Sequence, residues 1–120
     1  MADEIITSVA SNYDVVAYEG DDFDFSLVVK NEDGTDFDFT DYTAKMHVRK
    51  RRVESDPLIL AFTTDSEITL SSGSILIKKS SEDMGNVSGD YFYDLKMVDA
   101  DGLTTTWLFG KFIIHPTVTT

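Results

Sequence analysis

Hydrophobic and polar side chains alternate at every second residue through several short stretches of this chain, a periodicity typical of half-buried β-strands. The clearest case spans residues 89–114, where two long runs flank an Asp-Ala-Asp-Gly turn at residues 99–102. The glycine of that turn tolerates the positive φ that closes a short hairpin. We assign one side of the first run to the core: Tyr91, Tyr93, Leu95 and Met97.

The second run of this hairpin is hydrophobic on both of its sides. Leu103, Trp107, Phe109 and Ile113 share one side, whereas Leu108, Phe112 and Ile114 share the other. We interpret Gly110 as a β-bulge that changes the facing partway along the strand. Pro116 cannot donate a ladder hydrogen bond, so we expect regular pairing to end near His115.

Shorter runs of the same kind predict further strands upstream, near residues 13–18, 23–29, 42–51, 58–62, 68–70 and 75–77. We expect one helical turn at residues 80–84, with Ser80 as its cap and Asp83, three residues later, reaching back. Seven to nine short strands with one helical turn predict an all-β fold, a single antiparallel immunoglobulin-like β-sandwich. We expect residues 13–120 to form this domain, and residues 1–12 to form an extended arm that includes an edge strand.

Composition narrows the classes of function. The 120 residues suit one domain, and there are no cysteines for a disulfide, a thiol nucleophile or a cysteine zinc site. The lack of cysteines fits synthesis in a reducing cytoplasm. Neither a signal peptide nor an apolar run of bilayer length is expected. The net charge of −12 argues against binding to nucleic acid or to an anionic membrane.

The charge is unevenly distributed along the chain. Residues 1–41 hold twelve acidic residues and one base, Lys30, whereas residues 42–52 hold five bases and no acid. In one interpretation, the outward side chains of this basic strand pair with acidic outer residues of the same sheet, such as Asp22 and Asp24 or Asp36 and Asp38. In the other, they meet the acidic N-terminal part of the next copy, head to tail. The predicted interface residues are Ile5, Ile6, Lys45, His47, Arg49 and Arg51.

Other chemistry has weaker support in the sequence. Asp21, Asp22 and Asp24, or Asp99 and Asp101, could offer oxygens to calcium, but they lack EF-hand spacing and fit turn and surface roles. His47 and His115 lie far apart, and the motifs of hydrolases, zinc proteases and phosphate loops are absent. We therefore expect no catalytic residues, no metal, no cofactor and no small-molecule substrate. Trp107 and the tyrosines keep a carbohydrate-binding module open as an alternative, although such rings commonly anchor cores and interfaces.

The order of several blocks resembles a known family. These blocks are residues 23–29, the Asn-Glu-Asp-Gly turn at residues 31–34, DFTDYTAKMHVRK at residues 38–50, and a Y-x-Y-D-L…D-x-D-G…G-x-F pattern across residues 91–112. They are similar to small immunoglobulin-like structural proteins of tailed phages and prophages, and to the N-terminal domain of phage baseplate upper proteins.

The resemblance implies a non-enzymatic virion component, made in the host cytoplasm. It would be assembled in multiple copies at the tail, neck or baseplate as an adaptor or collar, with other virion proteins and its own copies as partners. The chain ends at Thr120 without a fibre region, so we expect no direct role in host recognition. A capsid decoration or head-fibre attachment protein is the alternative within the same class.

Overall fold

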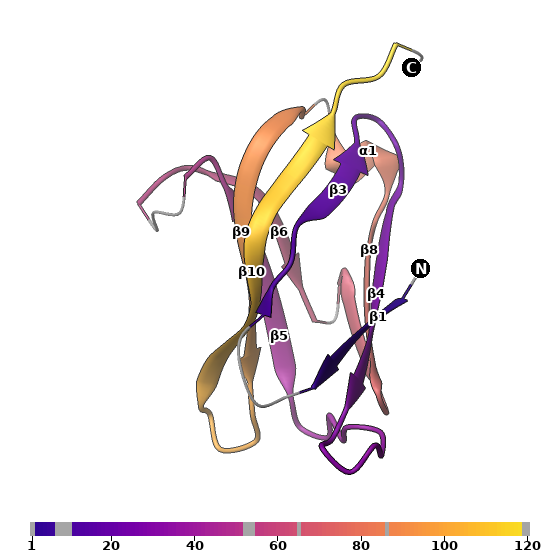
Figure 1. Ribbon diagram of the computed structural model, residues 1–120. Helices are drawn as coiled ribbons and strands as arrows, with labels where there is room; N and C mark the ends of the chain where they lie inside the picture. Colours follow the sequence, from indigo (N-terminus) through magenta and orange to yellow (C-terminus); the bar gives the residue numbers. More distant parts are fainter. Residues whose placement is uncertain (1, 7–10, 52–54, 65, 86, 119–120) are drawn as a thin grey trace.

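The computed structural model shows a β-sandwich whose two layers and connecting loops can be followed in Figure 1. It describes residues 2–6, 11–51, 55–64, 66–85 and 87–118, the first of these segments by its backbone alone. The hairpin predicted from the sequence is present as β9 (Gly89–Val98) and β10 (Thr104–His115). In the described part of the chain, no helix is long and apolar enough to cross a membrane.

The smaller sheet contains four strands in the order β1-β4-β8-β7. These are β1 (Ala2–Ile6), β4 (Phe23–Lys30), β8 (Ser74–Lys79) and β7 (Ile68–Ser71). β4, β8 and β7 pair antiparallel, whereas β1 runs parallel to the second half of β4. The predicted N-terminal arm therefore does contain an edge strand, and that strand pairs with its own chain.

The larger sheet is built around the hairpin, in the order β2-β10-β9-β5-β6 with β3 also on β10. Its other members are β2 (Ser11–Asn12), β3 (Val15–Tyr18), β5 (Thr43–Arg49) and β6 (Leu58–Thr63). β2 and β3 follow one another along the same side of β10, and both run parallel to it. Because β2 and β3 share one position beside β10, the ten described strands occupy nine positions in two sheets. This confirms the predicted sandwich. At one edge of each sheet, the N-terminal strands pair in parallel with their neighbour.

The core lies between the two inner faces and consists of alternate side chains of the strands. Leu27 and Val29 of β4 are buried, as are Met46 and Val48 of β5. On β9 the predicted inward set is confirmed for Tyr93, Leu95 and Met97, while Tyr91 is half-buried at the start of the strand. Burying such side chains contributes roughly 1.5–3 kcal/mol each, so this alternation is the main stabilising feature of the fold.

The register change in β10 is not where the sequence placed it. Thr106 pairs with Lys96 and Leu108 with Leu95, so Trp107 is the extra residue and the predicted bulge at Gly110 is wrong. Gly110 pairs regularly with Tyr93. It is required for a different reason, because a Cβ at this position would lie 2.5 Å from the carbonyl oxygen of Tyr13. After the bulge, Leu108, Phe112 and Ile114 face the core.

The predicted helical turn is α1 (Ser81–Met84), and Ser80 is its N-cap. The Ser80 hydroxyl accepts a hydrogen bond from the Asp83 amide at 3.2 Å. A second cap comes from the distant chain, because the Asp22 carboxylate accepts from the Ser81 amide at 2.6 Å. This contact ties the turn before β4 to the connection between β8 and β9.

Candidate protein-binding surface

The basic stripe predicted from the sequence lies on the outer face of β5. Ala44, Met46 and Val48 of this strand are buried, so the alternate residues Lys45, His47 and Arg49 point outward. β5 lies between β9 and β6 in the larger sheet. The structure therefore brings four of the predicted interface residues together, because Arg51 follows the end of the same strand.

Arg49 and Arg51 are held in place by the connection to β6. The Arg51 guanidinium donates to both carboxylate oxygens of Asp56, at 2.9 and 2.7 Å, and Arg49 donates to the Asp56 carbonyl at 2.6 Å. The hydrogen bonds from Arg51 hold the pKa of the Asp56 carboxyl below its ordinary value. Asp56 is only 7% exposed, whereas 72% of the Arg51 side chain is exposed. The pair fixes the loop and leaves the guanidinium at the surface.

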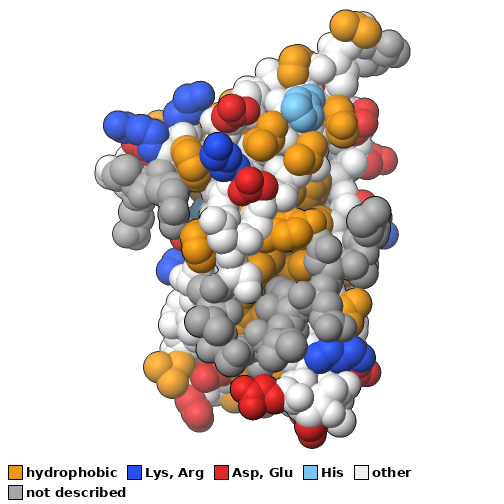
Figure 2. Space-filling view, in the orientation of Figure 1, with side chains coloured by type: hydrophobic (Ala, Val, Ile, Leu, Met, Phe, Trp, Pro, Cys, Tyr) orange, Lys and Arg blue, Asp and Glu red, His pale blue; other side chains and the backbone are white. Residues whose placement is uncertain are grey.

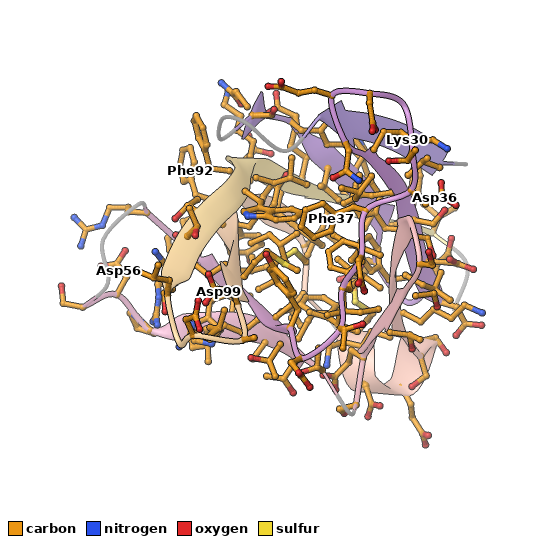
Figure 3. All side chains as sticks on the ribbon, turned by 90° about the horizontal axis from the view of Figure 1, so that it is seen from below. Lys30, Asp36, Phe37, Asp56, Phe92 and Asp99 are labelled. Atoms are coloured by element: carbon orange, nitrogen blue, oxygen red, sulfur yellow. The ribbon has the colours of Figure 1, made fainter. Side chains whose placement is uncertain are left out.

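Asp56 is a residue whose role sequence reasoning missed. In the sequence, Asp56 stands in a polar stretch before Pro57, and the available signal was an acid five residues after Arg51. Only the reversal of the chain between β5 and β6 brings the two side chains into contact. In the end view of Figure 3, Asp56 lies on the side of the molecule away from the Lys30–Asp36 pair.

His47 sits among charged neighbours at the centre of the stripe. Partial burial lowers its pKa, the charges of Arg49 and Lys45 lower it further, and Asp94 on β9 acts in the opposite direction. Its Nδ1 lies 3.4 Å from an Arg49 nitrogen, a geometry in which an unprotonated imidazole accepts the hydrogen bond. At neutral pH the charge of the stripe therefore comes from its lysine and arginines.

Lys45 stands directly opposite a second lysine. The register pairs Lys45 with Lys96 of β9 on one side and with Thr63 of β6 on the other. Lys96 donates to the Thr106 hydroxyl at 3.1 Å. Like charges on facing strands are destabilising, so the stripe costs the isolated fold some stability.

The four acids suggested as partners of this stripe are not its partners. Its acidic neighbours are instead Asp94 of β9, which pairs in register with His47, and Asp56, which binds Arg51. Asp22 and Asp24 belong to the segment of β4, which lies in the smaller sheet, and Asp36 and Asp38 follow it. Their contacts are elsewhere: Asp24 with Lys78 at 3.9 Å, Asp36 with Lys30 at 2.8 Å, and Asp38 with the Thr40 amide at 2.9 Å. The two sheets separate the basic stripe from these carboxylates.

Ile5 and Ile6, the remaining predicted interface residues, lie in β1. Their backbones pair with Val29 and Lys30 of β4, at an edge of the smaller sheet. This places them in a different sheet from the basic stripe, so the predicted set forms two separate regions. The contact of β1 with a neighbouring subunit stays a prediction.

An open groove lies between β3 and β4, on the side of the larger sheet opposite β6. Its volume is about 290 Å³, and Val15, Ala17 and Phe23 form part of its lining. Four acidic residues also belong to its lining, Asp14, Asp21, Asp22 and Asp24. Figure 2 shows hydrophobic side chains in a hollow beside β3 and at the surface over β3 and β10. The acidic part of the sequence thus forms a surface separate from the basic stripe.

The aromatic side chains that could stack on sugars close one end of the sandwich instead. Trp107 packs against Phe37 at an interplanar angle of 84° and against Tyr42 at 63°. Phe39 and Tyr42 meet at 89°. Figure 3 shows Phe37 at the centre of this end of the molecule. Rings packed edge to face against the core do not form the flat platform that sugar stacking needs, which weakens the carbohydrate-binding alternative.

The two histidines and the acidic turns are not assembled into a site. His115 stacks beside Tyr18 with 5.4 Å between ring centroids, on β10 and β3, whereas His47 is on β5. The Asp99 carboxylate accepts from the amides of Asp101 and Leu103, as expected of a turn residue. Within the described segments, no group of three or more histidine, cysteine or acidic side chains could hold a metal ion.

Comparison with known proteins gives a structural likeness but no sequence family. No family model matches the chain, and no curated protein matches it. The fold is similar to that of the N-terminal domain of phage TP901-1 ORF48, with a TM-score of 0.50, 11% identity, and coverage of 96% of this chain and 99% of that domain. At this identity the likeness concerns the fold alone.

A weaker likeness is to a family 123 glycoside hydrolase from Clostridium perfringens, with a TM-score of 0.39 and 16% identity. The matched region covers 91% of this chain but only 24% of the hydrolase. At this TM-score the likeness carries no inference about activity.

Proposed function

We propose that this protein is a non-enzymatic structural component of a tailed-phage virion, present in multiple copies at the tail, neck or baseplate as an adaptor or collar. The observation that carries the proposal is the likeness of its fold to a phage protein domain along nearly the full length of both chains. The ordered sequence blocks that resemble phage structural proteins support the same setting. The proposed localisation is therefore the virion.

The surface of the molecule supports a role in binding other proteins. The outer face of β5 carries fixed guanidinium groups, and at the opposite edge of the larger sheet lies a groove whose lining includes acidic residues. Complementary faces of this kind set partner choice and orientation in assemblies. We propose that other virion proteins and further copies of this chain are the partners, with Lys45, Arg49 and Arg51 among the contacts.

The setting is tested on purified phage particles that encode this chain. We expect mass spectrometry to detect the protein at several copies per particle, and labelled antibodies viewed by electron microscopy to bind at the tail, neck or baseplate. Label on the capsid shell would favour the decoration alternative. Absence of the chain from intact particles would refute a virion role.

The basic stripe is tested with a matched pair of variants. Lys45→Glu reverses a charge inside the stripe, whereas Lys78→Glu makes the same change of net charge on the outer face of the smaller sheet. We expect K45E to reduce incorporation into particles and K78E to leave it unchanged. Equal incorporation of both variants would exclude the stripe from the assembly contacts.

A further inference from the structure

The strand β3 lies at one edge of the larger sheet. Every second residue of β3 directs its backbone amide and carbonyl groups away from β10. The Tyr13 amide donates to the Phe109 carbonyl and the Glu19 amide donates to the His115 carbonyl, so the odd-numbered residues of this segment face β10. Alternate residues of a strand point their amide and carbonyl groups to opposite sides. The backbone groups of Val16 therefore point toward the groove.

The other side of the sheet ends at β6, and the same reasoning applies there. The Thr64 amide donates to the Ala44 carbonyl, so even-numbered residues of this segment face β5. The outward groups of Thr63 are used by Glu67, through its amide and its carboxylate. The amide and carbonyl of Ala61 point outward, away from β5.

Both edges carry exposed hydrophobic side chains. Five large hydrophobic side chains are exposed among the described residues, and three of them lie on these two strands. The exposed fractions are 50% for Val16, 50% for Tyr18 and 45% for Leu58. β6 (LILAFT) contains no charged residue at all. Natural edge strands are normally protected by charges, proline or a covering loop, because an unprotected edge pairs with another strand. Among the described residues, Glu67 covers β6 at Thr63, but the edges at Val16 and Ala61 carry no such protection and are available to a partner strand.

The space beside β3 is suited to an added strand. The groove of about 290 Å³ separates β3 from Asp22, Phe23, Asp24 and Phe25 of the smaller sheet. A strand that pairs with β3 would lie about 4.8 Å from it. The groove therefore leaves the edge of β3 open where the described residues surround it.

The charges around the two edges are complementary. The acidic residues Asp14 and Asp21 flank β3 in the chain and line the groove, whereas the basic side chains of β5 lie beside β6. One chain thus offers an acidic edge and a basic-flanked edge at opposite ends of the same sheet. The basic-flanked β6 edge of one copy therefore has the opposite charge to the acidic β3 edge of a second copy.

We propose that β6 of one copy pairs with β3 of the next, so that the larger sheets of neighbouring subunits form one continuous sheet. The two surfaces differ and lie on opposite sides of the molecule, so the contact is head to tail and produces a ring or a filament. The basic strand β5 of one subunit then lies one strand away from the acidic segment around β3 of the other. This contact specifies the self-assembly within the proposed function, on which it rests for its biological setting.

The test uses proline substitutions that spare each subunit's own ladder. In Val16→Pro and Ala61→Pro the lost amide is one that points outward, so V16P and A61P remove pairing to the neighbour only. We expect the wild type to show concentration-dependent oligomers in sedimentation velocity at low salt, weakened at high salt. Each variant is expected to weaken this self-association by about tenfold or more, because hydrogen bonds at the new edge are lost.

Mixing the two variants gives the decisive result. V16P retains its β6 and A61P retains its β3, so an equimolar mixture is expected to form a 1:1 heterodimer that grows no further. Circular dichroism and melting curves verify that each variant is folded. If a proline variant is unfolded, Val16→Lys or Leu58→Glu replaces it, because these side chains are already exposed. Leu103→Lys, which changes an exposed leucine away from both edges, is the control and is expected to associate as the wild type does.

Several outcomes would overturn the proposal. These are a wild type that stays monomeric at low salt and high concentration, folded variants that associate as strongly as the wild type, and a mixture of folded variants that forms no heterodimer. The result is independent of the particle experiment above. A chain absent from virions could still form the capped heterodimer, and a virion protein could fail to form it.

Discussion

At the scale of single residues, position 110 shows how a side chain can be excluded by a neighbouring strand. Gly110 is buried in β10, beside the carbonyl of Tyr13 and the side chains of Asn12 and Asp14. These groups come from the segment that joins β2 to β3 on the adjacent side of β10. The glycine therefore permits the close approach of the N-terminal strands to the hairpin.

Gly110→Ala is expected to destabilise the protein by roughly 1–3 kcal/mol, the range for overpacking a well-packed site. The added methyl would lie 2.5 Å from the Tyr13 oxygen, so β2 and β3 must shift. Urea denaturation monitored by tryptophan fluorescence measures the change. Lys111→Ala, at the exposed neighbouring position, is the control and is expected to stay within about 0.5 kcal/mol of wild type. Equal stability of G110A and wild type would contradict the close approach.

Tyr93 is a second residue whose contribution depends on a distant segment. Its side chain is 4% exposed, and its hydroxyl donates to the Tyr13 carbonyl at 2.7 Å. Burial raises the pKa of the Tyr93 phenol well above its ordinary value of 10.0, and Tyr13 and Asp14 act in the same direction. The folded protein therefore holds this hydroxyl in its neutral, donating form.

Tyr93→Phe is expected to cost roughly 1–2 kcal/mol, because the Tyr13 carbonyl loses its donor. Tyr91→Phe is the matched control, since the Tyr91 hydroxyl donates to the Ser88 carbonyl at an exposed position. The unfolded chain ionises its tyrosines near pH 10, before folded Tyr93 does. The wild type should thus keep its full stability below that pH and lose it as the pH rises further, and Y93F should lose less. Parallel alkaline profiles for the two proteins would contradict this.

At the scale of elements, β5 combines a well-packed inner face with an unfavourable outer one. Three buried side chains fix the strand, and Lys45 then faces Lys96 across to β9. A like-charge pair on facing strands is retained although it costs stability. Such a cost is expected where the charges bind a partner.

Lys45→Glu is expected to stabilise the isolated chain by about 0.5 kcal/mol, because it turns a repulsive cross-strand pair into an attractive one. The same variant is expected to weaken assembly, so stability and binding should change in opposite directions. Thermal melting in a buffer that keeps the protein monomeric measures the first effect. Lys78→Glu should not stabilise, since Lys78 lies 3.9 Å from Asp24. A K45E protein less stable than wild type would refute the repulsion.

The strands themselves were largely predictable, whereas their connections in space were not. The runs assigned to β4, β5 and β9 have the predicted inner faces, and Ser80 caps α1 as expected. The bulge was misplaced because both sides of residues 107–114 are hydrophobic, so the periodicity shows that the facing changes but not at which residue. Trp107, the actual bulge, is three residues before Gly110. The parallel edges of β1 and β3 were not predicted, because pairing direction is set by the path of the chain between sheets.

At the scale of the whole molecule, a net charge of −12 opposes compaction and also keeps copies apart. The distribution of this charge is consistent with the proposed association, because the basic side chains of β5 and the acidic residues that flank β3 lie toward opposite edges of the larger sheet. The fold and the assembly should therefore respond to salt in opposite ways.

We expect the melting temperature of the monomer to rise by a few degrees between low salt and about 0.15 M NaCl, where charges farther apart than about 8 Å are largely screened. Over the same range the self-association should weaken, because its charge pairs are screened as well. Differential scanning calorimetry of a monomeric edge variant and sedimentation of the wild type measure the two effects. A monomer that is destabilised by added salt would contradict dominant self-repulsion.

By itself, the sequence determined the all-β class, the inward side chains, the capped turn and the existence of a basic stripe. Each of these follows from side-chain periodicity or local hydrogen bonding, which a single segment specifies. Only the tertiary structure decided which strands neighbour one another, and hence that the stripe is separated from the acids of β4, that Arg51 meets Asp56, and that β3 and β6 end the same sheet. Those relations join residues far apart in the chain, so they are fixed by the packing of two sheets over one core and not by any local pattern.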